Sequence, residues 1–439
     1  MFILRSSLWT HFDCKNADKT RVYLERSKSS PIDLWMQRDR GLSPDDPFLE
    51  IDPCAIRRLK SLAIYGISES LQDITARLSH PAPSLKQLSI DGQYGFGPHR
   101  DWMLTTALFN GDLSSLRTLH LERVRTELPW RNMANLTSFT LWNTPPGGFT
   151  IDQLLDFFES APRLREIFLY LATPSSGGQN GRLVSLVCLK GMIIVGDEPS
   201  SLLLDHLLIP VGAKLTTRVE VDESEVDPLD PILEDHLPRS LDNLRNLAGF
   251  TKIRLHIREP YTRMNFSGPN GQLCAMPATS RVNATRSVLE SLARFDTSET
   301  ERLEIDCGSA LSRDHLYQAL LPMRNLRMLT LYRCKNPQIF IDALRPDTGP
   351  PNILVCPELE ELAFDIRRSG REFDIDSVIE MAAARALSGK ELTRVRIVDH
   401  RDILDPVYIS ELREHVQNVE YGPGVIAFDD SSDVNDEED

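Results

Sequence analysis

Residues 115–122 read Ser-Leu-Arg-Thr-Leu-His-Leu-Glu, so leucines stand at Leu116, Leu119 and Leu121. In an extended strand, Leu119 and Leu121 point to one face, and the residues between and beside them point to the other. One short strand cannot bury such an apolar face by itself. The pattern L-x-x-L-x-L therefore predicts further copies of the same strand, stacked side by side.

Copies of the pattern occur along most of the chain. A first series consists of Leu59/Leu62/Ile64, Leu85/Leu88/Ile90, Leu116/Leu119/Leu121, Leu136/Phe139/Leu141 and Leu164/Ile167/Leu169. A second consists of Phe250/Ile253/Leu255, Leu303/Ile305 with Thr300 at the first position, Leu326/Leu329/Leu331, Leu359/Leu362/Phe364 and Leu392/Val395/Ile397. Between them the pattern weakens to Leu183/Leu186/Cys188 and the out-of-step Leu215/Val219/Val221. One match is weak evidence because leucine is common, whereas recurrence at roughly 20 to 35 residues indicates a repeat array.

The segments between copies have the periodicity of helices. Apolar residues recur at helical spacing in residues 68–78, 151–161, 285–295, 312–321, 376–387 and 409–416, and Thr150 is the expected N-cap of the second segment. Parallel strands need crossovers of this kind. The whole pattern resembles leucine-rich repeats, and this resemblance implies an α/β solenoid, a horseshoe with a parallel concave sheet and convex helices.

Composition limits the class of protein. The chain has 439 residues, of which 41% are apolar, and a repeat array can bury a large core although each unit contacts only its neighbours. The net charge of −15 argues against nucleic acid or an anionic membrane surface as a partner. The seven cysteines are scattered without a C-x-x-C pair, which predicts reduced thiols and a cytoplasmic or nuclear location. No apolar run is long enough to span a membrane.

A helix and a strand are predicted ahead of the first clear copy. Residues 16–27 have helical composition, and Ile32, Leu34 and Met36 alternate with Asp33 and Trp35. We therefore expect a capping helix/strand unit over residues 14–58, the solenoid over 59–421, and an acidic disordered tail over 422–439. Insertions are expected near 173–182, near 222–238, which is acidic, and near 259–279, which we interpret as a loop with its tip at residues 268–271.

A more specific resemblance begins at Ser7-Leu8-Trp9 and continues through residues 22–34, Val-Tyr-Leu-Glu-Arg-Ser-Lys-Ser-Ser-Pro-Ile-Asp-Leu. These sequences resemble the junction that follows the F-box in fungal F-box proteins with leucine-rich repeats, where S-L-W ends the F-box and Y-L-E-R-S-x-x-x-P-L-D-L opens the repeats. Pro-x-Leu also recurs before the strands that begin near residues 85, 164 and 359. By this resemblance, residues 1–13 are the residual C-terminal edge of an F-box-like segment, with the F-box itself largely missing.

The resemblance implies a substrate-recognition subunit of a Skp-cullin-F-box E3 ubiquitin ligase. Its partners would be a protein target and, only if an upstream F-box exists, a Skp-type adaptor and a cullin. The alternative is a free-standing leucine-rich-repeat interaction protein that has lost its F-box and does not bind the adaptor.

The sequence contains only incomplete versions of known catalytic and nucleotide-binding motifs. His400-Arg401-Asp402 resembles the kinase catalytic loop, but Val407 occupies the position of its metal-binding Asn. Gly95-Phe96-Gly97 has Arg100 in place of the third glycine of a dinucleotide fingerprint. The ten histidines include no H-x-x-x-H pair. The sequence therefore predicts no catalytic residue, no cofactor and no metal site.

The outward strand positions remain as the candidate site for a protein target. Strand alternation places on the concave face the residues Tyr65, Asp91, His120, Glu122, Trp142, Phe168, Tyr170, Arg254, His256 and Tyr332, together with Glu304, Asp306 and Asp365. The first ten are the candidate protein-binding residues. A mixture of aromatic and charged side chains is typical of recognition surfaces, in which Trp, Tyr and Arg are frequent anchors.

Overall fold

A computed structural model shows how these elements are arranged. It describes residues 6–38, 51–92, 103–104, 108–127, 130, 132–144, 148–172, 174, 181–196, 200–219, 237–257, 262–276, 284–308, 312–334, 336–346, 354–365, 373–398 and 404–423. The chain forms two compact units. Unit 1 comprises Met1–Glu220 and Asp235–Asn246, and unit 2 comprises Val221–Glu234 and Leu247–Asp439.

Unit 1 contains a parallel sheet in which successive strands are neighbours. Its order is β1 (His11–Asp13), β2 (Ile32–Arg38), β3 (Leu59–Gly66), β4 (Gln87–Gly92), β6 (Thr118–Glu122), β8 (Ser138–Trp142), β9 (Glu166–Tyr170), β11 (Gly191–Gly196) and β13 (Lys214–Val219). The helices are α1 (Ala17–Ser27), α2 (Pro53–Arg57), α3 (Ser68–Arg77), α4 (Ile151–Ser160) and α5 (Ser201–Leu204). Two small parallel pairs, β5 (Met103–Leu104) with β7 (Arg125–Thr126) and β10 (Val184–Ser185) with β12 (Leu207–Leu208), lie outside this sheet.

Unit 2 contains a mostly parallel sheet. Its order is β16 (Gly271–Met276), β15 (Thr262–Gly268), β14 (Lys252–Ile257), β17 (Arg302–Cys307), β18 (Met328–Tyr332), β19 (Glu361–Asp365), β20 (Leu392–Val398) and β21 (Val416–Gly422). Only the pairings of β15 are antiparallel among these. The helices are α6 (Ala284–Leu292), α7 (Arg313–Leu320), α8 (Gln338–Leu344), α9 (Ile375–Leu387) and α10 (Pro406–Leu412).

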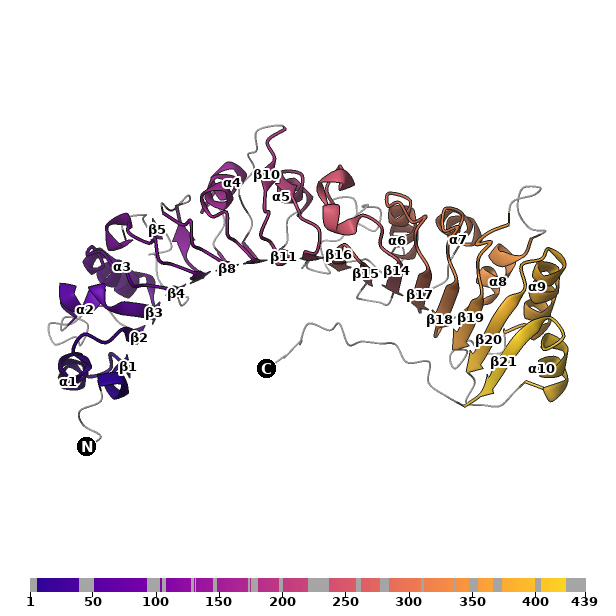
Figure 1. Ribbon diagram of the computed structural model, residues 1–439, viewed down its shortest axis with the longest axis horizontal. Coiled ribbons are helices and arrows are strands. Elements are labelled where there is room, and N and C mark those ends of the chain that lie inside the picture. The colour runs from indigo at the N-terminus through magenta and orange to yellow at the C-terminus, as the bar shows by residue number, and fades with distance from the viewer. Residues whose placement is uncertain are drawn as a thin grey trace. The chain divides into compact units, whose positions relative to one another are not determined.

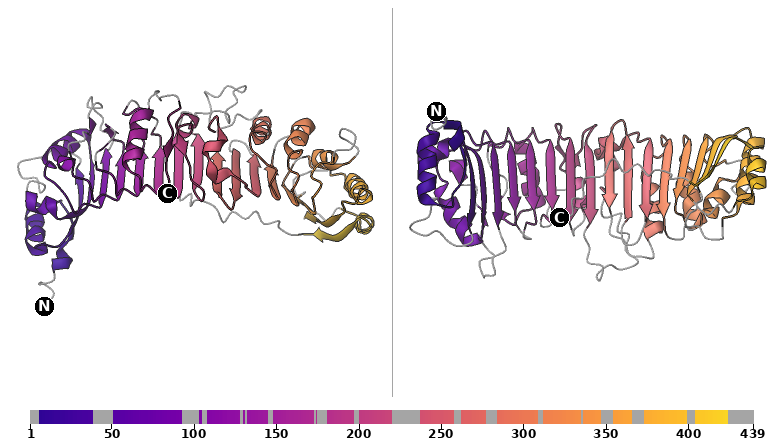
Figure 2. Two further views of the ribbon diagram at one scale, coloured as in Figure 1. Left: turned by 45° about the horizontal axis from the view of Figure 1, so that its top comes forward. Right: turned by 90° about the horizontal axis from the view of Figure 1, so that it is seen from below.

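The two faces of each sheet differ. In the described part of each unit, helices pack on one face, while the opposite face shows strands alone (Figures 1 and 2). The ring centroid of Phe139 lies 4.4 Å from that of Phe157 on α4, so the Phe139 side of β8 is the helix-covered face. We call the opposite face, to which His120 and Trp142 belong, the open face. Neither sheet closes into a barrel, so the predicted α/β class with parallel strands is confirmed.

The strand register predicted from the clear copies of the pattern is confirmed in both units. In unit 1, Leu88, Leu119, Phe139 and Ile167 pair across adjacent strands, as do Ile90, Leu121, Leu141 and Leu169. In unit 2, Leu303 pairs with Leu329, which pairs with Leu362. Each of these side chains is at most 2% exposed. Burying one such side chain contributes on the order of 1.5 to 3 kcal/mol, so these rows form the core.

The same turn follows several strands. The residue after the strand has a positive φ at Arg123 (53°), Asn143 (50°), Leu171 (44°) and Arg333 (48°). The backbone N–H of each of these residues donates a hydrogen bond to a backbone carbonyl near the C-terminal end of the next strand. Arg123, for example, donates to the Trp142 carbonyl at 2.8 Å. Gly92 follows Asp91 in the equivalent place, where a Cβ would lie 2.6 Å from the Arg123 carbonyl oxygen. The recurring turn is thus part of the structural unit, although its sequence varies.

The predicted helices form where expected, with one exception. Asn16 caps α1 by accepting a hydrogen bond from the Lys19 N–H, and Thr150 and Gln153 form a capping box at the start of α4. The predicted helix over 409–416 is wrong at its C-terminal end. The helix stops at Leu412, and Val416 begins β21, in which Val416 and Val419 are buried.

Two weak copies were assigned to the wrong residues. The copy at Leu183/Leu186/Cys188 is wrong, because the strand of the main sheet is β11, whose pattern Leu189/Met192/Ile194 begins six residues later. Leu215 does take an inward position opposite Met192, but the next inward residue is the buried Thr217. Methionine and threonine therefore concealed the alternation in this part of the chain.

The insertion near 259–279 is not a loop. β15 and β16 form an antiparallel hairpin, and Met264, Phe266, Leu273 and Ala275 are buried on one side of it. The Phe266 ring centroid lies 4.4 Å from that of Phe295, which anchors the hairpin to the core of unit 2. The glycine-rich tip was correctly placed, but the alternation on both sides of it indicated strands.

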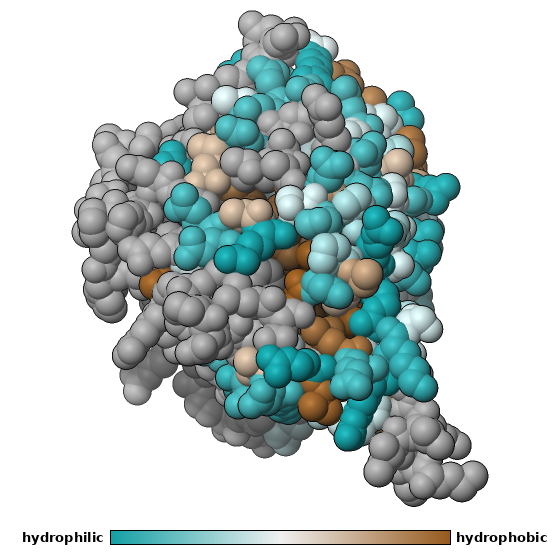
Figure 3. All heavy atoms as spheres, turned by 90° about the vertical axis from the view of Figure 1, so that its left-hand side faces the viewer, coloured by the Kyte–Doolittle hydropathy of each residue, from teal (hydrophilic) through white to brown (hydrophobic). Residues whose placement is uncertain are grey.

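The N-terminal end of unit 1 contributes to the sheet. The strand β1 pairs with β2, although residues 11–13 were interpreted as the edge of an F-box-like segment. The predicted helix/strand unit is present as α1 and β2. Seen from this end, the coloured residues are mostly hydrophilic, with smaller hydrophobic areas between them (Figure 3). Residues 222–236 of the acidic insertion, 175–180 and the tail from 424 onward lie outside the described residues.

Candidate functional site

The predicted outward residues gather in a few rows on the open faces. In unit 1, Tyr65, Asp91, Glu122, Trp142 and Tyr170 pair successively across β3, β4, β6, β8 and β9. His120 and Phe168 belong to the adjacent row, because both pair with Thr140. In unit 2, Arg254 pairs with Glu304, and His256 pairs with Asp306, which pairs with Tyr332. The structure therefore brings together seven of the candidate residues in unit 1 and three in unit 2.

Three aromatic side chains form a stack on the open face of unit 1. The Trp142 ring lies 4.4 Å from the Tyr170 ring and 5.3 Å from the Phe168 ring, with interplanar angles of 20° and 18°. All three side chains are half-buried. Ile193 on β11 continues the row of Phe168. Parallel strands hold neighbouring rings about 4.8 Å apart, so the sheet itself fixes the stacking distance.

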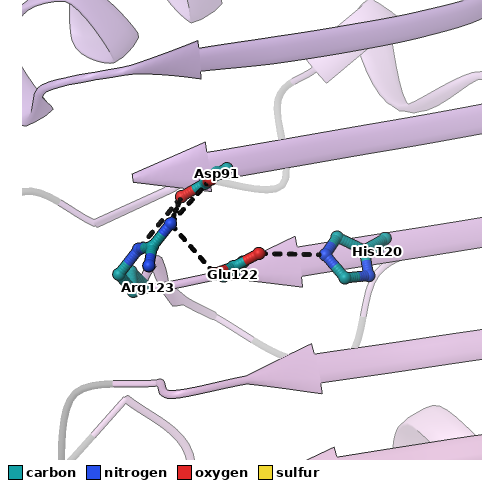
Figure 4. A network of polar contacts seen from close by, with 4 residues as sticks. All are labelled: Asp91, His120, Glu122 and Arg123. Atoms are coloured by element: carbon teal, nitrogen blue, oxygen red, sulfur yellow. Dashed lines mark hydrogen bonds and ion pairs between the residues drawn. The ribbon is translucent and has the colours of Figure 1, made fainter. Parts of the chain in front are cut away.

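Asp91, His120, Glu122 and Arg123 form a network of charged residues (Figure 4), and Glu122 pairs with Trp142 of the aromatic stack. Arg123 donates from Nη2 to Asp91 Oδ1 at 2.6 Å and Oδ2 at 2.7 Å, and contacts Glu122 at 2.9 Å. His120 lies 3.5 Å from Glu122. Arg123 follows β6 with a positive φ, and its side chain reaches Asp91 on the preceding strand, β4. The network holds Glu122 next to Trp142 in a fixed position.

The same arrangement recurs in unit 2. Arg333 also follows a strand with a positive φ, and its guanidinium donates to Asp306 on the preceding strand. His256 approaches Asp306 from the other side, at 3.1 Å. An arginine after one strand and an aspartate on the strand before it thus form a clasp in each unit. Sequence reasoning missed Arg123 and Arg333 because neither belongs to a strand.

A second carboxylate of unit 2 is enclosed by three cations. Glu304 accepts from Arg254 Nε at 2.8 Å and lies 3.0 Å from Lys252 Nζ and 2.7 Å from Arg302 Nε. The Glu304 side chain is 1% exposed. Because β14 and β17 are in register, Arg254 stands directly opposite Glu304 and closes over it. This cluster occupies the open face, yet water does not reach its carboxylate.

The outward residues on the open faces differ in their exposure. Buried members are Asp91, Arg254, Glu304, Asp306, Tyr332 and Asp365. Tyr65, His120, Glu122, Trp142, Phe168, Tyr170 and His256 remain partly exposed. Opposite charges on neighbouring strands pair, and long arginine side chains cover the shorter carboxylates. Six of the seven partly exposed candidate residues therefore lie in unit 1.

The described residues also bear on metal binding, membrane insertion and thiol chemistry. Among them, no group of His, Cys, Asp or Glu side chains is arranged to hold a metal ion. No helix in the described ranges has both the length and the apolar character needed to cross a bilayer. The seven cysteines are free thiols, and burial raises the pKa of Cys334 and raises that of Cys356 to about 12. Such thiols are poor nucleophiles because the thiolate is the reactive form.

The buried Tyr332 is expected to make the free energy of unfolding depend on pH in the alkaline range. Burial, and then the nearby charge of Glu304, raises the pKa of Tyr332 well above its ordinary value. The unfolded chain ionises first, so this contribution to stability is complete below pH 10 and decreases as pH rises further. At pH 11, the contribution of Tyr332 to the free energy of unfolding should be about 1.4 kcal/mol smaller than at pH 9. Urea unfolding at both pH values should show this decrease for the wild type and a correspondingly smaller one for Tyr332→Phe. Equal decreases in the two proteins would contradict the assignment.

No protein-family model matches the chain, and no curated protein sequence matches it.

Proposed function

We propose that this chain is a non-catalytic leucine-rich-repeat solenoid that binds a protein target. The observation that carries the proposal is the aromatic stack of Trp142, Phe168 and Tyr170 on the open face of unit 1, beside the network around Arg123. Aromatic and arginine side chains are the usual anchors of protein interfaces, and a charged rim supplies orientation. The repeat assignment is supported by the recurrence of the strand pattern, its register and the turn with positive φ.

The length of the row of candidate residues on the open face of unit 1 favours a polypeptide over a small molecule as the ligand. The row from Asp91 through Glu122 and Trp142 to Tyr170 crosses four neighbouring strands. At about 4.8 Å per strand, it extends over roughly 14 Å. A ligand that contacts both the partly exposed Glu122 and the rings lies extended along this row, with a basic or hydrogen-bonding group at one end and apolar groups at the other. A loop or terminal segment of a target protein has this form.

The wider role that we propose is target recognition in a Skp-cullin-F-box ubiquitin ligase, in the cytoplasm, the nucleus or both. The support is the resemblance of residues 7–9 and 22–34 to the segment that follows the F-box. In this role the chain positions a target lysine, and partner subunits perform ubiquitin transfer, so the contribution is one of proximity.

Adaptor binding tests this wider role. The full chain should be compared with a longer product of the same locus, if the transcript encodes an upstream L-P-containing helical segment of F-box length. Retention of a purified Skp-type adaptor by the longer product supports the ligase role. Failure of both products to retain the adaptor would leave the chain as a free-standing interaction protein.

Replacing Trp142 by alanine tests the binding face. We expect target binding to weaken about tenfold or more, because buried Trp side chains are frequent binding hot spots. The fold should survive, because Trp142 is half-buried and lies on the open face. The measurement is affinity purification with quantitative mass spectrometry from the source cells, followed by titration of the purified candidate target.

The control for Trp142→Ala is Tyr408→Ala, which removes a half-buried aromatic ring from α10. A protein retained by the wild type and the Tyr408 variant but lost by the Trp142 variant supports the proposed face. Retention of the same proteins by all three chains, with equal affinities, would place the interface elsewhere.

A further inference from the structure

The open face of unit 2 contains a small hollow with an unusual lining. Its volume is about 190 Å³, and Arg302, Arg394 and Arg396 contribute to its wall together with Glu361 and the apolar Met328 and Ala363. Arg302, Met328, Glu361 and Arg394 pair in succession across β17, β18, β19 and β20. The hollow therefore lies across the strands, with an arginine at each end of one row.

The lining is positive although the chain is acidic. Three guanidinium groups and one carboxylate give the lining a formal charge of 3 − 1 = +2, whereas the whole chain carries −15. Arg302 and Arg394 have side chains that are 42% and 40% exposed, so both reach solvent. These cations can attract an anionic group at this position, and the carboxylates of Glu304 and Glu420, which contact Arg302 and Arg394 from outside the lining, offset part of their charge.

The arginines are held in place by neighbouring carboxylates. Arg394 donates to Glu420 Oε1 from Nη2 at 2.6 Å and from Nε at 3.1 Å, and Arg302 Nε lies 2.7 Å from Glu304. The distance from Arg394 Nη1 to Glu361 Oε2 is 3.7 Å, which is longer than a hydrogen bond. A guanidinium carries five N–H donors, so Arg394 can keep both bonds to Glu420 and still bind a second carboxylate. Fixed arginines lose little side-chain entropy when a ligand binds.

We propose that this hollow binds an acidic segment of a partner protein, with carboxylates at positions i and i+4 of an extended peptide. Arg302 and Arg394 are separated by three strand spacings, or roughly 14 Å. Four residues of extended chain cover about 13 Å, so the two carboxylates meet the two arginines. The residue at i+2 then lies over Met328 and Ala363, where an apolar side chain fits. This site belongs to unit 2 alone and does not depend on the aromatic face of unit 1.

The test uses the full chain and a fluorescein-labelled, end-capped peptide Gly-Glu-Ser-Leu-Ser-Glu-Gly, followed by anisotropy at about 50 mM salt. A matched peptide with both glutamates replaced by glutamine should bind at least about tenfold more weakly, because charge-assisted hydrogen bonds are lost. Binding of the acidic peptide should weaken as the salt concentration is raised, because the charges of Arg302 and Arg394 are solvent-accessible and are screened by salt. Equal binding of the two peptides would overturn the proposal.

Variants locate the peptide on the protein. Arg394→Gln should weaken binding about tenfold, whereas Arg413→Gln removes the same charge from an exposed position at the end of α10 and should change little. Glu361→Gln removes the carboxylate of the hollow and should tighten binding by about threefold. Equal losses in the Arg394 and Arg413 variants, or no gain from Glu361→Gln, would refute the site. Displacement of the probe by inorganic phosphate at the same concentration as unlabelled peptide would assign the hollow to a simple anion instead.

Trp142→Ala should leave peptide binding unchanged, so failure of the proposed function and failure of this site can be told apart.

Discussion

Replacing Glu304 by glutamine is expected to lower the free energy of unfolding by about 3 to 5 kcal/mol, as is typical when one member of a buried ion cluster is removed. The Glu304 side chain is 1% exposed and is contacted by Lys252, Arg254 and Arg302. Glutamine has nearly the same shape as glutamate but lacks the negative charge. Its NH2 group is a hydrogen-bond donor and would face the N–H donors of the lysine and arginine side chains. Arg254, whose side chain is 7% exposed, would then lose its charge-assisted contact with the Glu304 carboxylate.

The measurement is urea unfolding of the purified chain, monitored by circular dichroism. Glu358→Gln is the control, because Glu358 is an exposed carboxylate that pairs with Lys390 at 2.8 Å on the surface of the same unit. Surface pairs contribute little, so this variant should keep the wild-type midpoint. A small effect of Glu304→Gln, similar to that of the control, would mean that water reaches the cluster and that the open face of unit 2 is more exposed than described.

The strand register could be predicted from the sequence because burial has a period of two residues. A strand shifted by one position would expose Leu119 and Leu121 and bury Thr118 and His120. Such a shift would lose the burial of apolar side chains within a single strand, which costs a large free energy. A pattern of a few residues therefore determines the register. The prediction failed at β11 and β13, where Met192 and Thr217 occupy inward positions and the leucine pattern is lost.

The exposure of the outward residues could not be predicted in the same way. Alternation correctly assigned Glu304 and Asp306 to the open face, but their burial depends on which cations stand opposite them on the next strand. Strand pairing over about 50 residues of sequence decides this, as the contact between Arg254 and Glu304 shows. The turns at Arg123 and Arg333 were equally hidden, because a positive φ is uncommon for arginine and leaves no compositional signal. Both clasps therefore became visible only in three dimensions.

The candidate site of unit 1 was easier to foresee than that of unit 2. Trp142, Phe168 and Tyr170 all follow from alternation, and their stacking follows from the registered strands. Trp142, Phe168 and Tyr170 remain half-exposed, whereas Tyr332 on the open face of unit 2 is buried. Charged side chains of opposite sign instead neutralise and cover one another. The open face of unit 1 therefore has aromatic candidate anchors, whereas that of unit 2 has arginines paired with carboxylates, among them the buried Glu304 and the partly exposed Glu420.

Leu119→Ala is expected to lower the free energy of unfolding by about 2 to 5 kcal/mol, because the substitution leaves a cavity in the packed core. Leu119 is fully buried between Leu88 and Phe139 on the neighbouring strands. His120→Ala is the matched control on the same strand, since His120 lies on the open face and its side chain is 32% exposed. Its effect should remain within about 0.5 kcal/mol, the usual range for surface substitutions. Because adjacent residues of a strand point to opposite faces, the difference between the two variants measures the register directly. A larger loss for His120→Ala than for Leu119→Ala would mean that β6 is shifted by one residue, and the rows of the open face would then have to be assigned again.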